Sequence, residues 1–319
     1  NRIVNSKNLT TDYWLLTCRN TNTKINNMSL KIVVLAKQVP DTRNVGKDAM
    51  KADGTINRAA LPAIFNPEDL NALEQALRLK DAHPGSTVTI LTMGPGRAAD
   101  IIREGLFRGA DNGYLLTDRA FAGADTLATS YAIATAIRKI GECDLIIGGR
   151  QAIDGDTAQV GPQVAEKLGL SQITYTEEIL NVDETARRIT VKRHIDGGVE
   201  TVEGPLPIVI TVNGSAAPCR PRNAKLVQKY KHAKTITEKQ QGNLDYTDLY
   251  DTRDYLNLVE WSVADVNGDL KQCGLSGSPT KVKAIQNIVF QAKESKTISG
   301  SDREVEELIV ELLENHTIG

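Results

Sequence analysis

Short β-type runs alternate regularly with helical patterns from Met28 to about Val212, and this alternation limits the chain to few folds. Strands are expected over residues 31–37, 87–93, 113–116, 145–148 and 206–212. Helical patterns lie between them, over residues 67–82, 97–108, 126–139 and 157–168. Strands that alternate with helices in this way form βαβ units. The sequence therefore predicts an α/β fold built on a parallel sheet.

Polar residues mark where three of these helices begin. Asn66 is expected to cap the first helix with its side-chain oxygen, and Pro67 suits the first helical position because it lacks an N–H group. Asp125 precedes the 126–139 pattern and Asp156 precedes the 157–168 pattern, each in the position of a cap. The three helices are therefore expected to start directly after these side chains.

The sequence changes character outside this region. Residues 1–27 are rich in Asn and lack periodicity, so we interpret them as a disordered extension of a fold that starts at Met28. Residues 188–203 predict an antiparallel hairpin that turns at Asp196-Gly197. The stretch from 220 to about 254 is first basic and then Asp-rich, with little helix or strand signal, and is interpreted as an arm. Apolar residues at helical spacing over 305–313 predict a final amphipathic helix.

Composition excludes several classes of function. The net charge of −2, from 38 basic and 40 acidic residues, provides no field that would hold a nucleic acid. No apolar run approaches the roughly 18–20 residues that span a bilayer. The four cysteines are far apart and no histidine pattern accompanies them, so neither a metal site nor a disulfide framework is expected. These features favour a reducing compartment, and we assign the chain to the cytoplasm.

The sequence nominates no nucleophile and no general base. Its four histidines are scattered, and no serine elbow or acid stands at triad spacing from them. If the chain takes part in redox chemistry, that chemistry belongs to a bound cofactor.

The first candidate nucleotide motif follows the strand at 87–93. The segment Gly94-Pro95-Gly96-Arg97-Ala98-Ala99 fits the pattern G-x-G-x-x-A between a strand and a helix. Such glycine patterns are also common at ordinary turns, and Pro95 removes one N–H group that could bind a phosphate. A plain turn and a nucleotide contact both remain open here.

A stronger motif runs from Gly149 to Pro162, between a strand and a helix. A loop in this place presents free N–H groups and the positive end of a helix to an anion, and residues 157–160 are the expected donors. Asp154 and Asp156 would repel a phosphate unless they cap the helix, brace the loop or bind a ribose. An ordinary capped helix is the alternative. No Walker-type lysine follows the glycines, so ATP hydrolysis is not expected.

Several motifs together carry a resemblance to a known family. They are Lys37-Gln38-Val39-Pro40-Asp41-Thr42, Asn66-Pro67-Glu68-Asp69, Thr92-Met93-Gly94-Pro95, the loop at 149–162 and the segment 191–211. In this order they resemble the β subunit of electron transfer flavoprotein over about residues 28–234. The remainder is matched less firmly, through the segment 274–280. The resemblance implies an adenine nucleotide α-hydrolase-like, parallel-sheet domain over 28–220 that binds FAD.

Members of this family are heterodimers of α and β subunits that carry electrons between a reductant and a dehydrogenase. In ordinary members the β subunit holds a structural AMP. In electron-bifurcating members it holds a second FAD, which takes a hydride from NADH. The electrons then divide between ferredoxin or flavodoxin and, through the FAD of the α subunit, an acyl-CoA dehydrogenase or similar partner.

The segment at 37–42 resembles the bifurcating group, so the resemblance favours FAD in the β subunit over AMP. A stand-alone module that senses AMP or ATP is a further alternative, because it would share the same strand, loop and helix.

The resemblance also assigns cofactor-binding positions. The adenosine pocket is expected at Leu35, Ala36, Asn66, Asp69 and Thr92, and the phosphates are expected against Gln151, Asp154, Gly155, Asp156, Thr157, Ala158, Gln159 and Val160. The isoalloxazine is expected towards Asp41 and Thr42, with Asp125, Thr126 and Thr129 near its linker. Gly94, Gly96 and Arg97 are candidate contacts for NADH.

Residues 221–226 resemble the family's partner-recognition loop. Leu226 is expected to be an exposed anchor for the dehydrogenase, with Arg222 beside it; packing would supply affinity and charge would steer the encounter. A solvated basic loop is the alternative. The rest of the C-terminal part, to residue 319, is expected to be an arm whose final helix packs on the α subunit or folds back on its own chain.

Overall fold

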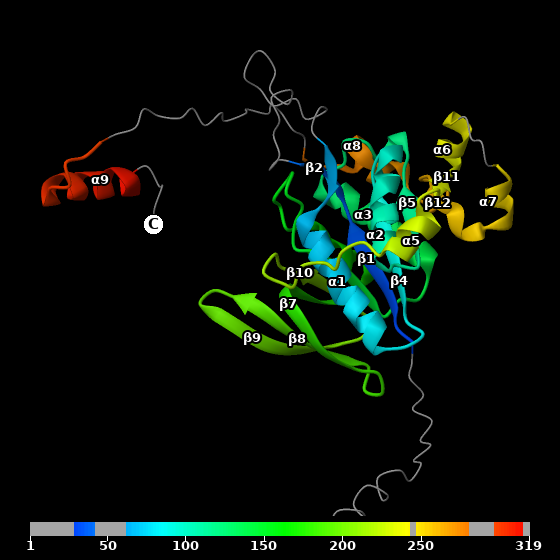
Figure 1. Cartoon of the computed structure of the whole chain (residues 1–319), viewed down its shortest axis with the longest axis horizontal. Helices are drawn as coiled ribbons and strands as arrows, with labels where there is room; N and C mark the ends of the chain where they lie inside the picture. Colours follow the sequence, from blue (N-terminus) through cyan, green and yellow to red (C-terminus); the bar gives the residue numbers. More distant parts are fainter. Residues whose placement is uncertain (1–28, 42–61, 243–246, 281–296, 315–319) are drawn as a thin grey trace, which may run out of the picture. The chain divides into compact units, whose positions relative to one another are not determined.

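The computed structural model describes residues 29–41, 62–242, 247–280 and 297–314 (Figure 1). The first three ranges lie in one compact unit, and residues 297–314 lie in a second unit, which contains helix α9 (Asp302–Glu314). Residues 1–27, expected to be disordered, and Thr42, expected near the isoalloxazine, lie outside the described residues.

The larger unit is built around a sheet whose described strands follow the order β11-β12-β5-β4-β1-β6-β10-β7-β8-β9. Neighbours from β11 to β7 are parallel, whereas β7, β8 and β9 are antiparallel. The strands are β1 (Lys31–Ala36), β4 (Thr87–Met93), β5 (Asn112–Leu116), β6 (Leu145–Gly149), β7 (Ser171–Asp183), β8 (Arg188–Ile195), β9 (Gly198–Pro205), β10 (Ile208–Val212), β11 (Lys234–Thr235) and β12 (Asn257–Trp261). Strands β2 (Gln38–Pro40) and β3 (Ala63–Phe65) form a separate antiparallel pair.

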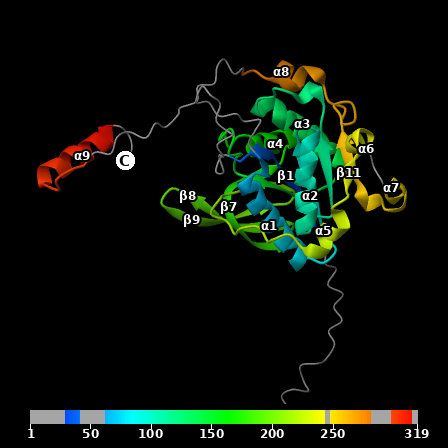
Figure 2. The ribbon, with the colours of Figure 1, turned by 45° about the horizontal axis from the view of Figure 1, so that its top comes forward.

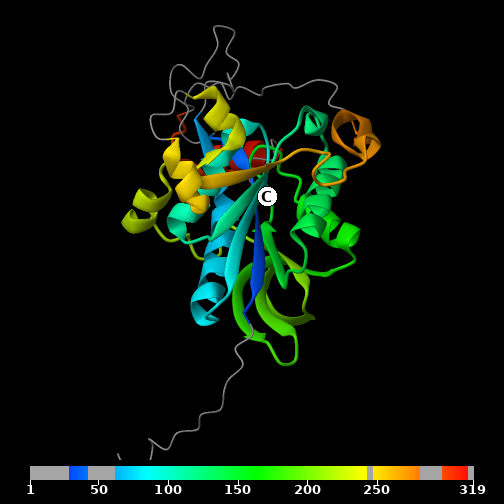
Figure 3. The ribbon, with the colours of Figure 1, turned by 90° about the vertical axis from the view of Figure 1, so that its right-hand side faces the viewer.

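Helices cover both faces of the central strands. The helices of this unit are α1 (Pro67–Ala82), α2 (Ala99–Arg108), α3 (Thr126–Ile140), α4 (Val160–Leu168), α5 (Ala224–Tyr230), α6 (Ile236–Gln241), α7 (Asp248–Thr252) and α8 (Gly274–Gly277). Ile32 and Val34 of β1 pack in one core cluster with residues of α1 and α2, and Val33 and Leu35 pack in another with residues of α3 and α4. Figure 3 shows α1, in cyan, and the green helices on opposite sides of the strands.

Burial on both faces explains why these strands are continuous apolar runs in the sequence. The predicted α/β fold and parallel sheet are confirmed, and the predicted helix at 67–82 and strand at 87–93 have the observed bounds. The hairpin also forms, as β8 and β9 around Asp196-Gly197, although it continues the main sheet through β7.

Two predicted helix caps are wrong. Helix α4 begins at Val160 instead of residue 157, so Asp156, which has a left-handed backbone (φ 48°), lies four residues before the helix and does not cap it. Asn66 stands at the start of α1, but its side chain makes no cap hydrogen bond because it is bonded to another loop. Asp125 does cap α3, since its carboxylate accepts the N–H of Ala128 at 3.0 Å.

The predicted arm after residue 220 is also wrong as far as residue 280. Figures 1 and 2 show α5, α6, α7, β11 and β12 gathered together in yellow. Strand β12 pairs with β5, so this segment extends the main sheet. Tyr230, Tyr250, Leu258 and Trp261 are buried in the two core clusters. The compact unit therefore continues past the expected boundary at residue 220.

Candidate nucleotide site

The carboxyl ends of β4, β1 and β6 meet at one edge of the sheet, because these strands are parallel neighbours. From β1 the chain proceeds to β4 and β5 on one side and then returns to β6 and β10 on the other. Such a reversal of strand order is the usual place for a ligand in an open α/β sheet. Lys37 follows β1 and Gly149 ends β6, so these two residues flank the reversal.

The buried carboxylate of Asp69 joins the two strand ends at this point. One oxygen accepts the N–H of Lys37 at 2.8 Å, and the other accepts the N–H of Gly149 at 2.9 Å. The side chain is 7% exposed. Burial raises the pKa of Asp69 to about 7, although hydrogen bonds from Lys37, Asn66 and Gly149 act to lower it.

The first turn of α1 holds the loop that follows β6. Asn66 donates from Nδ2 to the carbonyl of Gln151 at 2.8 Å and accepts the N–H of Ile153 on Oδ1 at 3.2 Å. Glu68 accepts the N–H of Gln151 at 2.9 Å and pairs with Arg150 at 3.0 Å. Asn66 and Asp69, expected in the adenosine pocket, therefore have their side-chain polar groups directed to this loop and to the strand ends.

The loop itself presents backbone N–H groups. Asp156 and Ala158 have positive φ values of 48° and 51°, and Gln159 returns to the right-handed helical region. Successive left- and right-handed residues direct neighbouring N–H groups to one side, a conformation that binds anions. Within the described part of the chain, the N–H groups of residues 157–161 have no acceptor. The start of α4 adds the positive end of a helix that no side chain caps.

The two loop aspartates are braced. Asp154 pairs with the Nζ of Lys37 at 2.7 Å, and Asp156 accepts from the Nε2 of Gln151 at 2.9 Å. The positive charge of Lys37 offsets the negative charge of Asp154 and so reduces the repulsion between Asp154 and a nearby phosphate. Among the roles that the sequence left open for these residues, the structure shows braces of the loop and excludes a helix cap.

The start of α3 reaches the same loop. Thr126 donates to the Oε1 of Gln159 at 2.9 Å. Asp125 uses one oxygen to cap α3 and the other to accept from Thr280 at 2.7 Å. Burial alone would raise the pKa of Asp125, but the hydrogen bonds from Ala128 and Thr280 hold it below its usual range. Thr129, on the same first turn, donates its N–H to the carbonyl of Asp125.

The other residues predicted for the adenosine pocket lie at the same strand ends. Leu35 and Ala36 end β1, and Thr92 lies near the end of β4. The hydroxyl of Thr92 is buried, with no hydrogen-bond partner in the described residues, which suits a polar ligand atom. Asp41 is buried further along the chain, and its N–H donates to the carbonyl of Pro62 at 2.8 Å.

The candidate NADH turn follows β4 at the same edge. The N–H of Gly94 donates to Leu116 at 3.1 Å, and Gln38 donates from Nε2 to the carbonyl of Arg97 at 3.1 Å. A Cβ on Gly96 would meet nothing within 4 Å, so this side of the turn is open. The turn thus lies at the same edge as the loop, and Arg97 in it is exposed.

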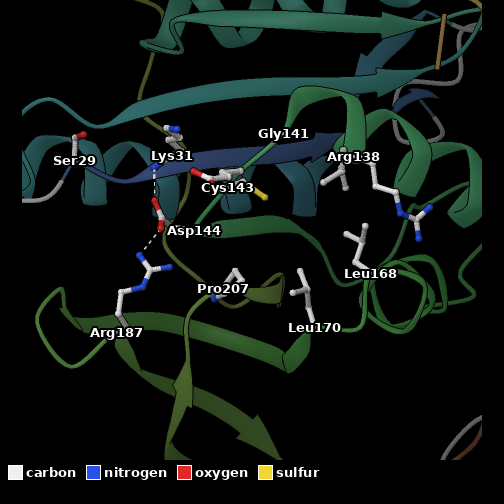
Figure 4. A pocket seen from close by; sticks show the side chains of 12 residues that line it. Ser29, Lys31, Arg138, Gly141, Cys143, Asp144, Leu168, Leu170, Arg187 and Pro207 are labelled. Carbon is white, nitrogen blue, oxygen red and sulfur yellow. Dashed lines mark hydrogen bonds and ion pairs between the residues drawn. The ribbon is translucent and has the colours of Figure 1, made fainter. Parts of the chain in front are cut away.

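A cavity lies at the opposite ends of the same strands. It has a volume of about 600 Å³ and opens at the amino ends of β1 and β6, between Arg138, Leu168 and Arg187 (Figure 4). Asp144 in its wall is already bonded to Arg187 and to the N–H of Lys31. Burial, with a smaller effect of Asp144, raises the pKa of Cys143 to about 11, which leaves this thiol unreactive. None of the residues predicted from sequence lines this cavity.

A second cavity of about 360 Å³ lies beside α8 and is lined by Leu127 and Ser278, close to the capped start of α3.

In the described ranges no cluster of His, Cys, Asp and Glu could hold a metal ion. The described helices also include none that is long and apolar enough to cross a membrane.

Comparison with known proteins shows which family the chain belongs to. Residues 53–241 match the model of the electron transfer flavoprotein domain. This chain belongs to the electron transfer flavoprotein family. The FixA protein of Azorhizobium caulinodans is 44% identical over 261 residues, which cover 80% of the chain and 84% of that relative. The β subunit of the electron transfer flavoprotein of Megasphaera elsdenii is 43% identical over 262 residues, covering 80% of the chain and 87% of the relative.

A third relative is the subunit CarD of the caffeyl-CoA reductase–Etf complex of Acetobacterium woodii. It is 41% identical over 254 residues, which cover 79% of the chain and 86% of the relative. These relatives place the chain with the β subunits of the family, as the sequence motifs predicted.

The expected recognition segment, residues 221–226, ends in the first turn of helix α5. Arg222 pairs with Glu104 of α2, at 2.6 Å between Nη2 and Oε1. Leu226 is partly buried and packs against the core, so it is less exposed than the sequence suggested, and its role as an anchor stays a prediction. The pairing and the packing hold the segment on α2, and only part of the leucine side chain faces solvent.

The sequence assigned Lys37, Glu68 and Arg150 no role of their own in the site, although they fall in the motifs at 37–42, 66–69 and 149–162. Lys37 neutralises Asp154, and Glu68 and Arg150 tie the loop to α1. The available signal was the acidic pair Glu68-Asp69 at the start of the predicted helix, since a carboxylate that becomes buried there needs N–H or cationic partners.

Proposed function

We propose that this chain is the β subunit of a heterodimeric, electron-bifurcating electron transfer flavoprotein that binds FAD at the carboxyl edge of its sheet. In this role it accepts a hydride from NADH. Its electrons go to ferredoxin or flavodoxin and, through the FAD of an α subunit, to a dehydrogenase of the acyl-CoA dehydrogenase type. The observation that carries the proposal is the row of N–H groups at residues 157–161, which have no acceptor in the described chain.

The residues at this edge fit an adenine dinucleotide. The uncapped start of α4 and the left-handed residues Asp156 and Ala158 suit a diphosphate. The apolar ends of β1 and the unpartnered hydroxyl of Thr92 suit an adenosine. The flavin would supply the redox chemistry when bound, and the chain's own residues would bind and orient it.

Three observations favour FAD over AMP in this subunit. The segment 37–42 resembles the bifurcating group, and one relative carries the name of a caffeyl-CoA reductase–Etf complex. The loop is also open where a second phosphate would need room, since a Cβ on Gly155 would meet nothing within 4 Å. The turn at Gly94, Gly96 and Arg97 is the proposed contact for NADH.

The proposed partners follow from two surfaces. Helix α9 has no buried residue, and its apolar side chains Val305, Ile309, Val310 and Leu313 are 38–48% exposed. An apolar stripe of this kind is stable when a partner covers it, and we assign that role to the α subunit. Arg222 and Leu226 are the proposed contacts for the dehydrogenase. The complex is assigned to the cytoplasm.

The test is the nucleotide content of the complex. The chain is co-expressed with its α subunit, the purified complex is denatured, and the released FAD and AMP are quantified by chromatography. Two FAD and no AMP per heterodimer are expected. One FAD and one AMP would overturn bifurcation and leave an ordinary electron carrier. AMP or ATP without any α subunit would favour a stand-alone sensor.

A matched pair of variants tests the place of binding. Thr157→Glu puts a carboxylate among the free N–H groups of the loop, whereas Thr201→Glu puts one on the exposed side of β9. The first is expected to lose nucleotide and the second to retain it. Equal retention in both variants would mean that the nucleotide lies elsewhere.

A further inference from the structure

The carboxylate of Asp69 links parts of the chain that are far apart in the sequence. It comes from the first turn of α1, yet it accepts N–H groups from the residue after β1 and from the last residue of β6. Each carboxylate oxygen thus already accepts one N–H group from a strand end. The side chain is buried, so it is poorly placed to touch a cofactor that approaches from the open edge.

The geometry points to Asp69 as a positioning residue: it fixes the start of the loop over 149–159 and thereby sets where the free N–H groups at 157–161 stand. This inference rests on the proposed function, because it concerns the same site. It differs from the resemblance, which places Asp69 among the direct contacts of the adenosine.

Close approach at Gly149 supports this role. A Cβ at this position would lie 2.5 Å from Oδ1 of Asp69 and 2.8 Å from its backbone nitrogen. Contacts of that length do not occur, so the absence of a side chain at 149 is what permits the bond between carboxylate and strand end. The start of the loop and the first turn of α1 can therefore approach this closely only with glycine at position 149.

The restraint continues along the loop. Asn66 and Glu68 hold residues 151 and 153, and the carbonyl of Ala152 accepts the N–H groups of Gly155 and Asp156 at 3.2 and 2.9 Å. Gln151 then bonds to Asp156. Asn66 also bonds the carboxylate of Asp69, so hydrogen bonds through Asn66 and Gln151 connect Asp69 to Asp156, the first of the two left-handed residues.

The charged groups around Asp69 have other partners. Glu68 pairs with Arg150, and Lys37, whose N–H reaches Asp69, directs its Nζ to Asp154. Among the described acids, Glu68 and Asp154 are thus already paired and do not replace Asp69 as acceptors of the two N–H groups.

The test measures nucleotide retention by the purified complex with the α subunit. Asp69→Ala removes both acceptors and Asp69→Asn keeps one. Glu74→Ala is the matched control, because Glu74 is a buried acid on the same helix whose carboxylate binds Arg220, away from the loop. The rate at which bound FAD or AMP is lost on dialysis is compared with the thermal midpoint, and amide hydrogen exchange is followed in peptides that contain residues 149–153.

We expect Asp69→Ala to lose nucleotide at least tenfold faster than the wild type, with Asp69→Asn between the two. Exchange at 149–153 should quicken in both Asp69 variants and stay unchanged in Glu74→Ala, even where that control lowers the thermal midpoint. Unchanged retention in both Asp69 variants, or losses that follow only the thermal midpoint in all three variants, would overturn the inference. A wild-type complex without nucleotide would instead overturn the proposed function, and unchanged exchange at 149–153 would then reject the positioning role separately.

Discussion

The hydroxyl of Thr126, the first residue of α3, donates to the side-chain oxygen of Gln159, the residue before α4, at 2.9 Å. This bond joins the starts of two helices whose positive ends face the same loop. Such a side-chain bond contributes about 0.5–1.5 kcal/mol to stability. We expect Thr126→Val and Gln159→Met to show a coupling free energy of about 1 kcal/mol in a double-mutant cycle, measured by urea unfolding of the full chain. Additive effects of the two substitutions would contradict a bond between them.

Gly149 is expected to tolerate no side chain. Gly149→Ala would bring a Cβ within 2.5 Å of the Asp69 carboxylate and 2.8 Å of backbone atoms, so the strand end or the helix must shift. Overpacking of this kind costs about 1–3 kcal/mol. Gly155→Ala is the control, because its Cβ would meet nothing within 4 Å. The control should stay within about 0.5 kcal/mol of the wild type in chemical unfolding. Equal stability of the two variants would show that the contact at Gly149 is loose.

The buried Asp69 makes a defined contribution to the pH dependence of stability. Its pKa is about 7 in the folded chain and 3.8 in the unfolded chain, so between these values the folded state binds the proton more tightly. The contribution is therefore fully present below pH 3.8 and is lost as the pH rises through about 7, with a slope of up to about 1.4 kcal/mol per pH unit.

The measurement is the unfolding free energy of the wild type and of Asp69→Asn from pH 5 to pH 8. The difference, wild type minus variant, should fall as the pH rises to about 7 and then level off. A difference that grows with pH would mean that hydrogen bonds from Lys37 and Gly149 outweigh burial and lower the pKa of this carboxyl.

The sequence predicted the central strands and their helices well, because burial on both faces leaves long apolar runs and strong helical periodicity. It failed at β7, where the buried Ile173, Thr176 and Val182 do not follow a spacing of two. The strand is bulged, with register shifts against both neighbours and a left-handed Tyr175. Each bulge adds a residue and breaks the alternation that identifies a strand.

The candidate site was predicted in its residues more than in its contacts. The motifs located the loop at 149–162 and the start of α1, because glycines, caps and strand ends are visible in a sequence. Spacing could not show that the side chain of Asn66 would bond Gln151 instead of capping its own helix, or that the carboxylate of Asp69 would accept the N–H of Gly149. Those bonds join residues 80 or more positions apart, and they depend on tertiary packing of α1 on β6.

The missed C-terminal strand gives the last prediction. Trp261 of β12 is only 9% exposed and stacks on Tyr114 of β5, with ring centroids 4.1 Å apart. Trp261→Ala should lower the unfolding free energy by about 3–5 kcal/mol, because it leaves a cavity and removes the stacking. Leu270→Ala, at a side chain that is 61% exposed in the same segment, is the control and should have little effect. If both variants unfolded at the same urea concentration as the wild type, residues 257–261 would be the peripheral arm that the sequence suggested, and the sheet would end at β5.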